Sequence, residues 1–162
     1  MGKKSAGILL FRLKQGYLEV LLVHPGGPFF KNKDLGSWSI PKGEFKDESP
    51  LQAAIREFKE ETGFEVKGDF LELTPIKQRS GKMVYAWALE GDLETSQIQS
   101  NTFELEWPPK SGKIQRFPEI DHADWFSVGV ARQKINGNQV PFIDQTISLL
   151  GLSDSQWIDP RS

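Results

Sequence analysis

Cysteine is absent from the 162 residues of this chain, and histidine occurs only twice, at His24 and His122. A chain without cysteine forms no disulfide bonds, which are typical of exported proteins. Two histidines so far apart in the sequence also make a zinc site unexpected, because zinc prefers cysteine and histidine ligands. We expect both histidines to lie at loop or strand ends rather than to act in catalysis.

Long apolar stretches are missing too. No run approaches the roughly 18 residues that suggest a membrane-spanning helix, and the N-terminus lacks the charged start and apolar middle of a secretion signal. Lysine and arginine total 20 against 22 acidic residues, for a net charge of −2, so there is no cationic excess for binding bulk nucleic acid or a membrane surface. We expect a cytoplasmic protein that acts on small molecules, and the sequence indicates no oligomeric state.

The pattern of apolar residues predicts alternating strands and helices. Apolar and β-branched runs bounded by turn residues predict strands, and apolar residues at helical spacing predict helices. The predicted strands cover residues 5–13, 17–24, 70–78, 83–90 and 124–128, and the predicted helices cover 50–62, 127–135 and 141–150. Residues 92–117 show no clear period. We therefore expect an α/β fold, with a mixed β-sheet and helices on both faces, in a single domain over residues 1–162 whose core spans about 5–150.

The helix over residues 50–62 has clear start and stop signals. Ser49 can cap its N-terminus, Pro50 suits the first helical position, and Gln52 completes a Ser-x-x-Gln capping box. Gly63 is a typical helix stop. One apolar stripe along this helix is expected to be buried, while its glutamates lie elsewhere on the surface. The residues of that stripe are Leu51, Ile55, Phe58 and Thr62.

Three glutamates gather within about one turn of this helix. Glu57 and Glu61 form an i, i+4 pair, Glu60 lies beside them, and Arg56 is adjacent. Such a cluster is either an ordinary solvated acidic face or a site for a hard divalent cation, Mg²⁺ or alternatively Mn²⁺. The small residues Ala53 and Ala54 favour the second interpretation, because they let another backbone or a bulky ligand approach the helix closely.

Two other segments offer candidate substrate contacts. Phe29, Phe30, Lys31 and Lys33 could stack a base and hold phosphates, or they could be the internal packing of a lid. Glu104 and Glu106 alternate as in a strand, so both lie on one face. They could bring a further carboxylate to the metal, or they could form an ordinary solvated edge.

The spacing around the helix resembles the Nudix box of the MutT-like Nudix hydrolase superfamily. The matching run is Glu48, seven residues, and then Arg56-Glu57-Phe58-Lys59-Glu60-Glu61-Thr62-Gly63-Phe64. One departure is the spacing upstream, because four residues rather than five separate Gly43 from Glu48. The resemblance extends over about residues 5–150 and implies a Nudix-type α/β/α sandwich.

The resemblance also implies an activity, a Mg²⁺-dependent hydrolysis of a nucleoside diphosphate linked to another moiety. By position, Glu57 and Glu61 would bind metal directly, Glu60 directly or through water, and the Lys42 carbonyl would add a backbone ligand. Glu48 would bind metal or brace Arg56, which would orient a glutamate of the box. The general base would be Glu57 or Glu119, with Glu104 or Glu106 behind them.

The substrate is left open by the sequence. The Pro41-Lys42-Gly43 entry to the box resembles that of dinucleoside polyphosphate and diphosphoinositol polyphosphate hydrolases, which favours a longer phosphate chain and makes Lys42 a candidate phosphate contact. ADP-ribose-type sugars and nucleoside triphosphates stay possible. The alternative is a catalytically silent Nudix-fold module that binds a nucleotide or a protein.

Overall fold

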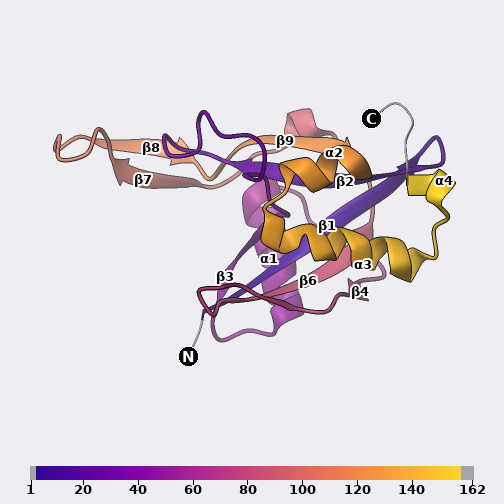
Figure 1. The fold of residues 1–162 in the computed structure, drawn as a ribbon. Coiled ribbons are helices and arrows are strands. Elements are labelled where there is room, and N and C mark those ends of the chain that lie inside the picture. The colour runs from indigo at the N-terminus through magenta and orange to yellow at the C-terminus, as the bar shows by residue number, and fades with distance from the viewer. Residues whose placement is uncertain (1–2, 158–162) are drawn as a thin grey trace.

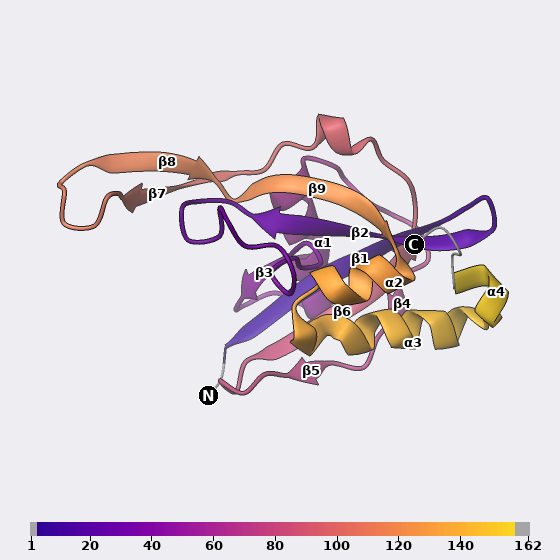
Figure 2. The ribbon, with the colours of Figure 1, turned by 45° about the horizontal axis from the view of Figure 1, so that its top comes forward.

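A mixed β-sheet lies between helices on its two faces in the computed structural model, which describes residues 3–157 (Figures 1 and 2). Helix α1 (Pro50–Thr62) covers one face. Helices α2 (Val128–Lys134) and α3 (Val140–Leu150) cover the other, and the short α4 (Asp154–Trp157) follows. The α/β class and the helices expected at these three places are confirmed.

The sheet is built around strand β1 (Lys4–Lys14). It forms an antiparallel hairpin with β2 (Tyr17–Pro25) and runs parallel to β6 (Met83–Glu90) on its other side. Gln15 and Gly16 connect the hairpin with φ values of 54° and 84°, the left-handed pair that matches the twist of a two-residue turn. The strand order is β4-β6-β1-β2-β9, so the central strands are buried on both faces.

Alternate residues of β1 feed two separate cores. Ala6, Ile8 and Leu10 pack with helix α1 on one face. Leu9 and Phe11 pack on the opposite face with residues of α2 and α3. This alternation follows from the two-residue period of a strand, and it explains why β1 is apolar throughout its centre.

Helix α1 begins and ends where the sequence predicts. The backbone N–H of Gln52 donates to Ser49 Oγ at 3.3 Å, and Gly63 ends the helix with φ 82° and a 2.7 Å hydrogen bond to the Lys59 carbonyl. The buried face, however, is rotated from the predicted stripe, because Leu51 and Ile55 are only half-buried. The buried residues of the helix are Ala53, Ala54, Glu57, Phe58 and Thr62.

The expected separation of core and acidic faces is therefore wrong at Glu57, whose exposed fraction is 9%. Ala53 and Ala54 are fully buried and let the helix approach strands β1 and β3 closely. Strand β3 (Lys42–Phe45) pairs with β1, opposing Gly43 to Ala6. Glu57, one turn further along the helix, is consequently enclosed between α1 and β3.

The predicted strand over residues 70–78 is interrupted. It forms two short strands, β4 (Leu71–Glu72) and β5 (Ile76–Lys77), which both pair with β6. Pro75 lies between them, and a proline cannot donate a hydrogen bond to a sheet ladder. The neighbouring Thr74 N–H donates instead to the Gln145 side chain on α3, at 2.6 Å.

Residues 92–117, for which no element was predicted, contain a short 3₁₀ helix (Thr95–Gln97) and most of a projecting β-hairpin. Strands β7 (Thr102–Glu106) and β8 (Ile114–Pro118) pair only with each other and extend away from the body (Figure 1). We call this hairpin the arm. Strand β9 (Ile120–Ser127) follows directly and returns to the main sheet, starting earlier than the predicted residue 124 because it pairs along β2 as far as Pro25.

In the part of the chain that the structure describes, no helix has the length and apolar character to cross a membrane.

The rotated core face of α1 gives a stability prediction. Phe58→Ala removes a fully buried ring and is expected to lower the free energy of unfolding by about 3–5 kcal/mol. Leu51→Ala, at a half-buried position of the same helix, is expected to cost clearly less. Urea unfolding followed by circular dichroism measures both, and equal losses would contradict the rotated face.

Candidate active site

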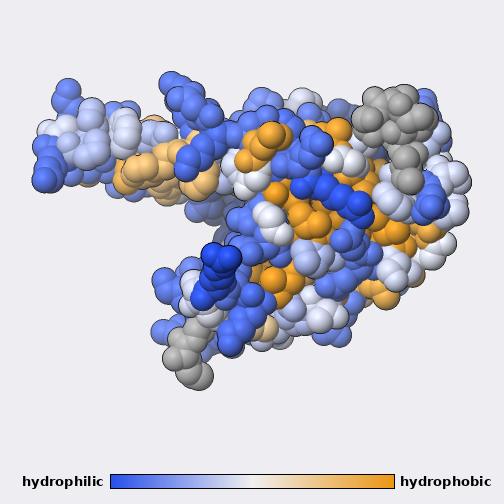
Figure 3. All heavy atoms as spheres, viewed as in Figure 1, coloured by the Kyte–Doolittle hydropathy of each residue, from blue (hydrophilic) through white to orange (hydrophobic). Residues whose placement is uncertain are grey.

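Five glutamates, from α1, strand β3 and the segment before β9, line a cleft of about 470 Å³ between the arm and strand β3. The space-filling view shows the molecule hollowed below the arm (Figure 3). The cleft is lined by Pro25, Gly26, Lys42, Gly43, Glu44, Glu57, Glu60, Glu61, Phe103 and Glu119. Most of these side chains are acidic, so the cleft wall carries more negative than positive charge.

Arg56 binds three carboxylates beside this cleft. Its Nε donates to Glu48 Oε1 at 2.9 Å, and Nη2 contacts the same oxygen. Its Nη1 donates to Glu57 Oε1 at 2.8 Å and to Glu60 Oε2 at 3.1 Å. The pKa of Arg56 is raised from its usual value, mainly by the hydrogen bonds that Arg56 donates to Glu48. The guanidinium therefore stays charged and fixes the positions of these carboxylates.

Gly43 lies against the Glu57 carboxylate despite the short loop that follows it. A Cβ atom built on Gly43 would be 2.0 Å from Glu57 Oε2 and 2.1 Å from Cδ, so only glycine fits here without displacing the carboxylate. Glu48, at the other end of the loop, still reaches Arg56. The missing residue therefore leaves Gly43, Glu48 and α1 in contact with one another.

Three carboxylates of the cleft, those of Glu57, Glu61 and Glu119, have raised pKa values. Partial burial, the largest cause, raises the pKa of Glu61 to about 8, although its Oε1 accepts a 3.2 Å hydrogen bond from the Lys42 backbone N–H. Burial also raises the pKa of Glu57, and burial together with the nearby Glu60 raises that of Glu119. Burial thus disfavours the charged forms of these three carboxylates, and the positive charge of Arg56 and Lys42 does not fully offset it.

Oxygen donors with too little countercharge suit a hard divalent cation such as Mg²⁺ or Mn²⁺. Lys42 is the lysine that lines the cleft. Burial lowers its pKa, which weakens its ability to neutralise the negative charge of the glutamates. Within residues 3–157, no three side chains of the ligating types already surround one point. Since Arg56 holds an oxygen of both Glu57 and Glu60, a bound cation would have to reorient these carboxylates.

Glu119 is brought to the cleft by a chain of backbone hydrogen bonds. Its N–H donates to the Asn101 carbonyl at 2.8 Å, and its carbonyl accepts from the Gly26 N–H at 2.8 Å. Asn101 in turn donates from its N–H to the Glu60 carbonyl at 2.9 Å. The last turn of α1 therefore fixes where Glu119 lies relative to the glutamates of the helix.

Other predicted site residues do not line the cleft. Phe29, 61% exposed, contacts the Trp107 ring on the arm, and neither Lys31 nor Lys33 lines the cleft. Glu104 pairs with Arg116 at 3.1 Å across the arm. The Glu106 carboxylate accepts from two backbone N–H groups of the arm's turn, so for both glutamates the solvated-edge interpretation agrees with the structure.

The sequence analysis missed Phe103 and Glu44 as residues of the cleft. Glu44 follows Gly43 directly in β3, and it could have been found from the strand assignment alone. Phe103 lies 39 residues after Phe64, the last residue of the box, and the aperiodic stretch around it gave no signal of where it would fold.

His24 has a structural role, as expected for a residue at a strand end. Its Nδ1 lies 2.8 Å from Asp121 Oδ1 and its Nε2 lies 2.7 Å from the Lys33 carbonyl oxygen. It thereby connects β2, β9 and the loop over residues 26–36. The expectation that His24 is not a catalyst agrees with this buried position.

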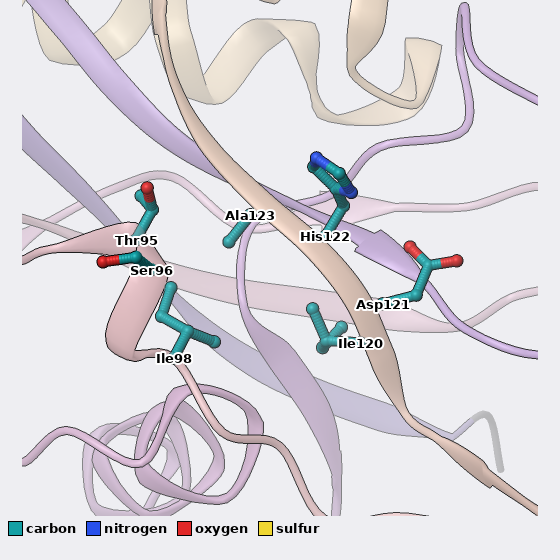
Figure 4. A pocket seen from close by; sticks show the side chains of 7 residues that line it. All are labelled: Thr95, Ser96, Ile98, Ile120, Asp121, His122 and Ala123. Atoms are coloured by element: carbon teal, nitrogen blue, oxygen red, sulfur yellow. The ribbon is translucent and has the colours of Figure 1, made fainter.

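A second hollow, of about 360 Å³, lies between the 3₁₀ helix and β9 (Figure 4). Its titratable side chains, Asp121 and His122, point away from Thr95 and Ser96 in this view. Asp121 is engaged by His24, and the hollow contains none of the box glutamates. The acidic cleft is therefore the stronger candidate for chemistry.

The family of the chain follows from comparison with known proteins. The NUDIX domain model matches residues 1–146, so the chain belongs to the Nudix family. As a member of this family it is a pyrophosphohydrolase, an enzyme that cleaves phosphorus-containing acid anhydrides. A search of curated proteins gives no match.

Solved structures show the same fold. An Ap4A hydrolase of C. elegans, in a binary complex, has a TM-score of 0.60 and 22% identity over 92% of this chain and 98% of its own. The NUDIX domain of Shewanella oneidensis NrtR, complexed with ADP ribose, has a TM-score of 0.63 and 18% identity over 93% and 89%. A MutT structure, from work on the Aliivibrio salmonicida and Vibrio cholerae proteins, has a TM-score of 0.55 and 16% identity over 90% and 96%.

The raised pKa of Glu61 predicts a pH-dependent stability. Because the folded state holds this proton up to about pH 8 and the unfolded state loses it near the ordinary value of 4.5, the free energy of unfolding should fall as pH rises between these values. The slope contributed by one such group is at most about 1.4 kcal/mol per pH unit. Urea unfolding in EDTA should show a shallower decline for Glu61→Gln, and parallel curves would contradict the assignment.

The contact between Gly43 and Glu57 predicts a loss of activity with little loss of stability. Gly43→Ala pushes only the end of a flexible side chain, but displacing that carboxylate by about 1 Å is expected to lower kcat by about 10²-fold. Gly137→Ala is the matched control, since a Cβ there meets nothing within 4 Å. Equal kcat values for the two variants would show that Gly43 does not position Glu57.

Proposed function

We propose that this protein is a Mg²⁺-dependent hydrolase that cleaves a pyrophosphate linkage in a nucleoside diphosphate joined to another moiety. The observation that carries the proposal is the set of carboxylates held by Arg56 on one wall of a cleft that also contains Glu119. Phosphoryl transfer depends on positioning and charge neutralisation more than on covalent protein chemistry. A cleft whose carboxylates are held in place and outnumber the nearby positive charges supports that kind of catalysis.

Within this proposal, Glu57, Glu60 and Glu61 hold the metal together with the Lys42 carbonyl, and Glu48 braces Arg56. Mg²⁺, when bound, polarises phosphate oxygens and favours deprotonation of the attacking water. Arg56 keeps Glu57 and Glu60 on the cleft wall through the same guanidinium nitrogen. The Lys42 N–H holds Glu61, so each metal ligand proposed on the helix has its own backbone or guanidinium support.

Glu119 is the better supported of the two candidate general bases. Glu57 is buried and one of its oxygens is bound to Arg56. Among residues 3–157, the carboxylate of Glu119 has no hydrogen bond or ion pair, and partial burial raises its pKa toward the range in which a base can take a proton near neutral pH. We assign it the role of accepting a proton from the attacking water.

For the substrate, we propose a dinucleoside polyphosphate, with ADP-ribose as the second candidate. The Pro41-Lys42-Gly43 entry to the box favours the first, and the fold shared with the C. elegans Ap4A hydrolase agrees with it. The fold shared with a NUDIX domain complexed with ADP ribose is the reason for proposing ADP-ribose as the second candidate substrate. Lys42 is the predicted phosphate contact that does line the cleft, while roles in binding for Phe29, Lys31 and Lys33 stay predictions.

A screen of hydrolysis, in which the nucleotide products are separated by anion-exchange chromatography, tests the proposal. The purified chain is incubated with Mg²⁺ and, in turn, Ap4A, ADP-ribose and the nucleoside triphosphates, with EDTA as the metal-free control. We expect turnover of Ap4A or ADP-ribose that EDTA abolishes. Binding of these nucleotides without any turnover would instead favour a catalytically silent module.

Glu61→Gln tests the metal site within this screen. The change removes one charged ligand and is expected to abolish Mg²⁺-dependent turnover, while the circular dichroism spectrum stays unchanged. Glu65→Gln is the matched control, because Glu65 is exposed and pairs with Lys59 outside the cleft. Full activity in Glu61→Gln would contradict its assignment as a metal ligand.

The single-domain organisation and the cytoplasmic location stay predictions.

A further inference from the structure

Phe103, on the first strand of the arm, is a half-buried aromatic residue that lines the acidic cleft. The lining is uneven, because apart from glycines only Pro25 and Phe103 are apolar and all other residues are charged. A ligand that fills this cleft therefore meets carboxylates and a lysine over most of the wall and one aromatic ring from the arm. With Mg²⁺ between the carboxylates and a phosphate group, a phosphate joined to a flat, apolar-faced ring would match this distribution of chemistry.

Two consecutive glycines bring the Phe103 ring to this position. A Cβ atom on Gly27, whose φ is 96°, would lie 2.8 Å from Phe103 Cζ. A Cβ atom on Gly26 would lie 2.0 Å from the Pro118 carbonyl oxygen. The loop after β2 and the root of the arm can approach this closely only because both positions lack side chains.

The ring is supported from behind and the arm is fixed at a second point. The rings of Phe103 and Phe117 pack across the arm with centroids 5.9 Å apart. Nearer the tip, Trp107 meets Phe29 edge to face at 5.4 Å, which joins the arm to the loop over residues 26–36. A ring held by a glycine on one side and another ring on a second side loses little entropy when a ligand stacks on it.

We propose that Phe103 is the platform on which the base of the substrate stacks, and thus a specificity-determining residue of this enzyme. This inference rests on the proposed nucleotide chemistry of the cleft. The base lies on the arm while the phosphates lie against the box, next to Glu119 at the arm's root. The aromatic contact expected from the Phe29 loop is thereby assigned to the arm, and Phe29 serves to hold Trp107 in place.

The test compares two probes that differ only in the base. Binding of AMP and of ribose 5-phosphate is measured by isothermal titration calorimetry, with Mg²⁺ present, for the wild type and for Phe103→Leu, Phe103→Trp and Ile114→Ala. Ile114 lies on the other strand of the arm, is 63% exposed and is absent from the cleft lining, so its variant controls for changes in the arm itself.

The wild type is expected to bind AMP roughly 5- to 150-fold more tightly than ribose 5-phosphate, the range that one stacked base supplies. Phe103→Leu should bring this ratio near one, whereas Phe103→Trp and Ile114→Ala should keep it. A change in the near-ultraviolet circular dichroism of Phe103→Leu would indicate that the arm is disturbed. In that case the AMP to ribose 5-phosphate binding ratio of Phe103→Trp decides whether an aromatic ring at this position is what binds the base.

An unchanged ratio in a folded Phe103→Leu, a ratio lost in Phe103→Trp, or a wild type that does not prefer AMP would overturn the proposal. Neither probe contains a pyrophosphate linkage, so the measurement does not depend on hydrolysis. Absence of turnover in the hydrolysis screen would therefore count against the enzymatic function, whereas the stacking proposal is decided by the binding ratio alone.

Discussion

The hydrogen bonds of one guanidinium group determine the arrangement of the site. Arg56 binds Glu48 in the loop before α1 and Glu57 and Glu60 on the helix itself, so loop and helix share a single centre of positive charge. Without it, three carboxylates would repel one another in a partly buried cleft. The loop, the helix and strand β3 can then pack closely, because Ala53, Ala54 and Gly43 leave room for the charged side chains between them.

The C-terminal end of the same helix organises the other wall of the cleft. The last carbonyl groups of a helix have no partners within it. Here the Thr62 and Glu60 carbonyls accept hydrogen bonds from the N–H groups of Gln99 and Asn101, at 3.0 and 2.9 Å. The strand that carries Phe103 starts immediately afterwards, so α1 supplies the glutamates from one side and sets the register of the arm from its end.

Much of the fold and of the box could be predicted because its signals are local. Ser49 and Gly63 define the helix, and the spacing from Glu48 to Gly63 indicates the family. The buried position of Glu57 was not predictable from helical periodicity, since it depends on how closely Gly43 of strand β3 packs against the helix. Phe103 was missed for a related reason, because its place in the cleft depends on glycines 26 and 27 and on hydrogen bonds between segments far apart in sequence.

The root and the tip of the arm differ in how strictly the structure constrains the length of the sequence between α1 and β9. The segment at its root cannot change length without moving Glu119, since Asn101 is bound to both the helix and that residue. Nearer the tip, the Trp107 ring contacts Phe29 in the loop over residues 26–36, and no residue of the turn beyond Trp107 lines the cleft. Insertions or deletions at that tip can thus accumulate while the positions of Phe103 and Glu119 in the cleft are inherited intact.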